Sequence, residues 1–186
     1  MIDVIFRYAT RRNVLIFMGI TLLGMFVLFP LLQNRLENLS GGYGFLDLMF
    51  PAFTIDDAYA RLEAYGEEGR AYHSTIHLTA DLLFPLIYGV AYALLIAFFW
   101  DGSSPRRGWV RYLPLLPFLA TIADYAENIL IGQMFSQFPD QSNALYRSAG
   151  SATFLKWTFQ FLSISVAAIG LLLFVARRTT PDVQTK

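Results

Sequence analysis

Three polar residues interrupt a long apolar stretch of the sequence. Asp124, Glu127 and Asn128 lie within residues 112–135, which are otherwise mostly apolar. Carboxylates that are withdrawn from water can bind protons, cations or hydrogen-bond donors, and an amide can orient a bound group. On a helix, Asp124 and Asn128 share one face and Glu127 flanks it. The spacing therefore predicts a helix that is polar on one face only.

Two other apolar stretches carry a similar polar stripe. Asp81 and Tyr88 share a face in the first of them, and Lys156 and Gln160 share a face in the second. A charge inside a membrane costs about 2.5–3.5 kcal/mol, so we expect the three stripes to face one another inside a bundle. The predicted ligand-binding residues are Asp81, Tyr88, Asp124, Glu127, Asn128, Lys156 and Gln160.

The charges in these stripes do not balance. Three acids, Asp81, Asp124 and Glu127, stand against Lys156, which leaves two negative charges if all four groups are ionised. Four things could compensate for these two charges: protons retained on the acids, a protonated His77, an Arg147 side chain that reaches into the bundle, or a bound cation. We expect retained or shared protons rather than a metal.

A metal site is the alternative interpretation of one motif. His73, His77 and Asp81 recur every four residues, which is a metal-ligand spacing on a helix face. The chain has only two His and we expect His73 at the level of the lipid headgroups, so we predict no metal and no other cofactor. The absence of Cys excludes disulfides, thiolate metal sites and thiol redox chemistry. No motif decides whether the protein is an enzyme.

The composition indicates that helices in a membrane position these residues. The chain is 55% hydrophobic, with a mean hydropathy of +0.46. A spanning helix needs about 20 mostly apolar residues. We predict an all-α protein with one membrane domain over residues 1–186, an antiparallel bundle of four transmembrane helices. The predicted spans are residues 14–32, 76–100, 112–135 and 152–176.

The distribution of basic residues predicts the orientation of the bundle. Nine Lys and Arg lie before the first span, between the second and third, and in the tail at residues 177–186, whereas four lie on the opposite side. Basic residues favour the cytoplasmic side. We therefore expect an integral protein of the plasma (inner) membrane with both termini in the cytoplasm. The balanced total charge indicates no nucleic-acid partner.

The predicted outside segment, residues 33–75, has its own pattern. GGYG at 41–44 is a flexible break, and Thr54 can cap a short extracytoplasmic helix that ends at Gly66. The apolar residues of this helix follow helical spacing, so we expect it to lie on the bilayer or cover the bundle. The sequence from Glu67 onward predicts a helix that continues directly into the second span.

The order of these motifs resembles two groups of proteins. The chain resembles uncharacterised bacterial four-span membrane proteins. The resemblance rests on four segments in order: LTADLLFPLIYGVAY, a basic turn, LPFLATIADYAENIL, and a last span with Lys near its outer start. The layout is more distantly similar to the EXPERA group, which includes sterol isomerases and the sigma-2 receptor. That resemblance implies a cavity for sterol-like ligands, with Asp81 and Glu127 as the acids that face the ligand.

Three functions are compatible with the sequence. The first is binding of a membrane lipid or lipid-like small molecule in a buried acidic and polar cavity in the outer half of the bilayer. The second is a structural or assembly subunit, with a membrane-protein partner or a second copy of the chain, in which an Asp81–Lys156 pair only holds helices together. The third is a component of a proton- or cation-coupled transporter. No ionisable residue is expected inward of Asp124, which argues against the third.

Overall fold

The computed structural model describes residues 2–101, 108–140 and 142–179, and the regular structure in these ranges is helical. Four helical stretches in them are long and apolar enough to cross a membrane: Arg11–Ser40, Gly66–Trp100, Trp109–Gln137 and Asn143–Thr179. Each stretch contains one predicted span, so the helical class and the four apolar helices are confirmed. Most of the predicted basic turn after Trp100 and the end of the tail lie outside the described residues.

The first stretch contains a local widening of the helix. The short helix α1 (Ile2–Tyr8) precedes α2 (Arg11–Leu23), which continues through the π-helical turn η1 (Gly24–Leu28) into α3 (Phe29–Ser40). Pro30 has no N–H to donate to the preceding turn, and a π turn accommodates such an irregularity. At Gly24, a Cβ atom would overlap the ring of Phe84, so the absence of a side chain lets this stretch approach its neighbour closely.

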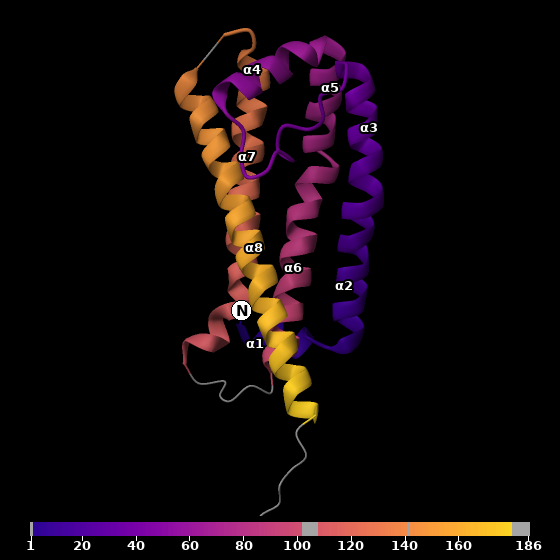
Figure 1. The fold of residues 1–186 in the computed structure, drawn as a ribbon, viewed down its shortest axis with the longest axis vertical. Helices are drawn as coiled ribbons and strands as arrows, with labels where there is room; N and C mark the ends of the chain where they lie inside the picture. Colours follow the sequence, from indigo (N-terminus) through magenta and orange to yellow (C-terminus); the bar gives the residue numbers. More distant parts are fainter. Residues whose placement is uncertain (1, 102–107, 141, 180–186) are drawn as a thin grey trace, which may run out of the picture.

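The helix predicted after Thr54 is present. In α4 (Ile55–Ala64), Thr54 Oγ1 accepts from the Asp57 backbone N–H at 3.1 Å, and the Thr54 N–H donates to the Asp57 carboxylate at 2.9 Å. Hydrogen bonds from the side chain and backbone of Thr54 lower the pKa of Asp57. Gly66 follows α4 with a φ of +58°, in the left-handed region that favours glycine. In Figure 1, α4 lies across one end of the bundle.

The second stretch is not one continuous helix, which corrects the prediction. α5 (Gly66–His77) and α6 (Ala80–Trp100) are separated at Leu78 and Thr79. The Thr79 hydroxyl donates to the carbonyl of Thr75 at 2.7 Å, and Thr79 itself leaves the helical region with φ −123° and ψ −88°. Threonine side chains compete in this way for backbone acceptors and bend helices. Because of the break, the side chains of α6 do not continue the helical spacing of α5 and can face a different direction.

The helix α6 is central in the arrangement. It packs against α2, α7 (Leu116–Gln137) and α8 (Asn143–Thr179), and α7 packs along α8 (Figure 1). A 3₁₀ segment, η2 (Trp109–Leu115), leads into α7. The polar stripes predicted on residues 76–100, 112–135 and 152–176 therefore come from three helices that contact one another.

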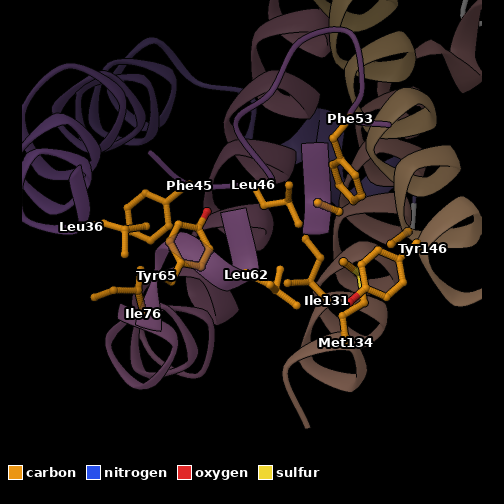
Figure 2. Packing of buried hydrophobic residues seen from close by; sticks show 12 residues of the cluster. Leu36, Phe45, Leu46, Phe53, Leu62, Tyr65, Ile76, Ile131, Met134 and Tyr146 are labelled. Atoms are coloured by element: carbon orange, nitrogen blue, oxygen red, sulfur yellow. The ribbon is translucent and has the colours of Figure 1, made fainter. Parts of the chain in front are cut away.

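An apolar core fills the end of the bundle that α4 covers. Figure 2 shows that its side chains come from α3, the loop before α4, α4 itself, α7 and α8, with examples at Leu36, Leu46, Leu62, Met134 and Tyr146. Fully burying an aliphatic or aromatic side chain contributes about 1.5–3 kcal/mol. This packing holds the loop of residues 41–54 against the bundle. The long connection is therefore part of the folded core.

Candidate functional site

The loop before α4 brings an acidic residue into the bundle. Phe45, Leu46 and Asp47 are all buried, with 4%, 0% and 3% of their surfaces exposed. The carbonyl of Gly44 accepts hydrogen bonds from Arg61 at 2.8 Å and from the Tyr65 hydroxyl at 2.7 Å, so α4 fixes the loop. Asp47 is not among the residues predicted from the sequence, because a loop residue belongs to no periodic pattern. The one indication in the sequence that Asp47 is buried is the run of apolar residues on both sides of it.

Lys156 connects this loop to α7. Its Nζ atom lies 2.5 Å from Glu127 Oε2 and donates to the backbone carbonyl of Asp47 at 2.9 Å. Thr153 on α8 donates to the other Glu127 oxygen. Lys156 and Glu127 are buried, so the pair is shielded from water. Lys156 therefore pairs with Glu127 and not with Asp81, the partner considered in the structural alternative.

Asp124 has one satisfied and one free carboxylate oxygen. The Tyr88 hydroxyl donates to Asp124 Oδ2 at 2.8 Å, whereas Asp124 Oδ1 is buried without a hydrogen-bond partner among the described residues. One turn away, Thr121 donates to the carbonyl of Pro85 at 2.8 Å, which ties α7 to α6. Asp124 is thus held in place through Tyr88 and still has an acceptor to offer.

Asn128 satisfies a backbone group that a proline leaves free. Pro85 has no N–H, so the carbonyl of Asp81 loses its usual helical partner. The Asn128 Nδ2 atom donates to that carbonyl at 3.3 Å. The Asp81 carboxylate points elsewhere, and its Oδ2 lies 3.5 Å from His77 Nδ1. Asn128 therefore acts mainly as a link between α7 and α6.

The two histidines face Asp47. His73 Nε2 and His77 Nε2 each lie 3.6 Å from Asp47 Oδ1, and the two rings are nearly parallel, with centroids 4.5 Å apart. His73 is not a side chain exposed on the surface of the bundle: it is fully buried against Phe45 and Phe135, and its depth in the bilayer stays a prediction. Burial raises the pKa of Asp47, but His77, Lys156 and His73 together lower it by more, so the net shift is downward.

A cavity of about 420 Å³ opens beside these groups. Its polar lining includes Asp47, Asp81, Asp124, Lys156 and Gln160, and Tyr88 also borders it. Its remaining lining, mainly from η1, α3 and the loop, includes Met25, Phe29, Pro30, Leu48, Phe84 and Trp157. Of the seven residues predicted to bind a ligand, Glu127 and Asn128 do not border the cavity. They support the residues that do.

The surplus of negative charge is larger than the sequence indicates. Asp47 joins Asp81, Asp124 and Glu127 among the buried acids, and Lys156 is the buried lysine that opposes them. If all five groups are ionised, three negative charges are left over. The two histidines, bound protons or a bound cation must compensate, because isolated charges are costly to bury.

Comparison of the chain with protein-family models, with curated proteins and with solved structures finds no match. The geometry of the cavity and of the side chains around it is therefore the basis for the function.

Proposed function

We propose that this protein binds one molecule of a small lipid or lipid-like amphiphile in the cavity between α3, α6 and α8. In this proposal the four helices cross the bacterial inner membrane as an antiparallel bundle, with both termini in the cytoplasm. The loop of residues 41–54 and α4 then lie on the outer side, and the cavity lies in the outer half of the bilayer. The EXPERA resemblance is compatible with such a ligand.

The observation that carries the proposal is the free oxygen of Asp124 in a cavity with apolar walls. Asp124 Oδ1 is a buried acceptor without a protein partner, and unpaired buried polar groups are rare because they cost free energy. The volume of about 420 Å³ lies in the range of small-molecule sites. Phe29, Phe84 and Leu48 supply the apolar surface that an acyl or ring system would contact.

The chemistry of the polar lining limits the head of the ligand. Asp124 Oδ1 has no hydrogen-bond partner among the described residues, and the carboxylates that line the cavity can only accept hydrogen bonds when ionised. A head that donates hydrogen bonds, through a hydroxyl or an amine, complements them. A phosphate head would place like charges together. We therefore favour a neutral or cationic amphiphile over an anionic one.

An exposed residue of the first predicted span borders the cavity, which favours a lipid over a water-soluble ligand. Pro30 borders the cavity on α3 and is exposed on the outer surface of the bundle. Inward of Asp124, the α7 residues Thr121 and Pro117 are buried and Thr121 is bonded to the carbonyl of Pro85, so neither of them continues the polar path. This arrangement favours a binding site over a transport path.

Mass spectrometry of lipids that co-purify with the protein tests the proposal. Asp124→Asn keeps an acceptor for Tyr88 and removes the charge, so we expect a folded protein that has lost most of the bound amphiphile. Asp140→Asn, an exposed residue outside the cavity, is the matched control and should retain it. A folded Asp124→Asn protein that carries the same lipid in the same amount would refute the proposal.

A further inference from the structure

We propose that Asp47, His73 and His77 form a binding site for one divalent transition metal, with Zn²⁺ as the expected ion. One ligand atom from each of the three residues lies within 4.8 Å of the other two. Two imidazoles and one carboxylate are a frequent zinc ligand set, in which a water or a bound molecule completes the coordination. The proposal is separate from amphiphile binding and does not depend on it.

The distances fit an ion between the three side chains. Both His Nε2 atoms lie 3.6 Å from Asp47 Oδ1, which exceeds the length of a good hydrogen bond. Zinc bonds of about 2.0–2.1 Å in a tetrahedral arrangement separate neighbouring ligand atoms by about 3.3–3.4 Å. Rotation of the two imidazole rings, which are stacked nearly parallel, would bring the three atoms to bonding distance of one ion.

The polar atoms of this cluster make no hydrogen bond among the described residues, although the two histidines lie 3.5–3.6 Å from the carboxylates of Asp47 and Asp81. All four ring nitrogens of His73 and His77, and Asp47 Oδ1, are buried without a hydrogen-bond partner. Buried imidazoles normally donate through one nitrogen and accept through the other. Two adjacent histidines with no such partners are well explained by an ion that takes one nitrogen from each.

The surroundings also match a metal site. The two histidines lie four residues apart on α5, so their rings project to the same side. Asp81 Oδ2 lies 3.5 Å from His77 Nδ1, where metal-binding histidines usually meet a carboxylate that fixes the ring. Lys156 holds the backbone of Asp47 from α8. A divalent cation would also compensate for two of the three surplus negative charges.

Asp47 would connect the metal to the cavity, because its side chain faces both. The sequence predicted no metal, because the chain has only two His and His73 is expected at the level of the lipid headgroups. Asp47 changes the interpretation by supplying the third ligand and moving Asp81 to a supporting position. The metal would then lie next to the polar lining, where it could bind a donor atom of a ligand.

Zinc analysis of the purified full-length chain tests this site. The protein is produced without a histidine tag, incubated with ZnCl₂, dialysed and measured by elemental analysis. We expect about one Zn²⁺ per chain, and loss of this zinc in His73→Gln, His77→Gln and Asp47→Asn. Asp81→Asn should lower the affinity about 10- to 100-fold, as the loss of a supporting carboxylate does. Asp124→Asn, which removes a nearby acid outside the ligand set, should keep its zinc.

X-ray absorption spectroscopy at the zinc edge identifies the ligands in the unmutated protein. It therefore tests the site even if a variant fails to fold. The expected spectrum shows two imidazole ligands and oxygen ligands at about 2.0–2.1 Å. Any of three results would overturn the proposal: no zinc in the dialysed protein, equal zinc binding by the three ligand variants, or a spectrum without imidazole ligands. Loss of the amphiphile but not of zinc in Asp124→Asn would show that the two sites are distinct.

Discussion

Lys156 contacts groups from two other parts of the chain, the Glu127 carboxylate on α7 and the backbone of Asp47. Removing one partner of a buried pair leaves the other charge uncompensated and costs about 3–5 kcal/mol. We expect Lys156→Met to lower the free energy of unfolding by this amount, measured by SDS titration in mixed micelles. The double variant Lys156→Met/Glu127→Gln should recover part of the loss, because the Glu127 carboxylate that Lys156 opposes is also removed.

Asp81→Asn is the comparison variant for Lys156→Met. It removes one of the surplus negative charges and keeps the backbone carbonyl that Asn128 binds, so we expect a smaller loss of stability. A larger loss in Asp81→Asn than in Lys156→Met would contradict this account of the buried charges.

At the scale of the elements, the approach of η1 to α6 shapes the cavity wall. A Cβ atom at Gly24 would overlap the ring of Phe84, which borders the cavity. We therefore expect Gly24→Ala to push Phe84 toward the cavity and to reduce the amount of co-purified amphiphile. Gly19→Ala is the matched control, because a Cβ atom there meets nothing within 4 Å. Equal lipid content in the two variants would argue against Phe84 as a wall of the binding site.

The sequence predicted the elements better than their interruptions. Helical spacing placed Asp81, Asp124 and Lys156 on polar faces, and these residues are buried between helices in the structure. The break at Thr79 depends on one hydroxyl that bonds back to a carbonyl, which hydropathy does not register. Asp47 could not be placed in advance, because the path of its loop is fixed by the distant residues Arg61, Tyr65 and Lys156. The pairing of Lys156 with Glu127 rather than Asp81 likewise depends on helix rotation.

At the scale of the whole molecule, the proposed orientation has both termini in the cytoplasm. The chain has no Cys, so single cysteines can be introduced and labelled without background. We expect a membrane-impermeant maleimide to label Glu67→Cys, at the exposed start of α5, in intact spheroplasts. Tyr8→Cys, which is 56% exposed, should be labelled only after the membrane is opened. The reverse pattern would invert the topology and place the cavity in the inner half of the bilayer.

The most direct test of the binding function is an experimental density map of the protein purified with its native lipids. We expect elongated density in the cavity between α3, α6 and α8, with its apolar part against Phe29 and Phe84. A donor atom of its head should lie about 2.7–3.2 Å from Asp124 Oδ1. A well-resolved map in which the cavity holds only ordered water, or is closed by the side chains around it, would contradict the account.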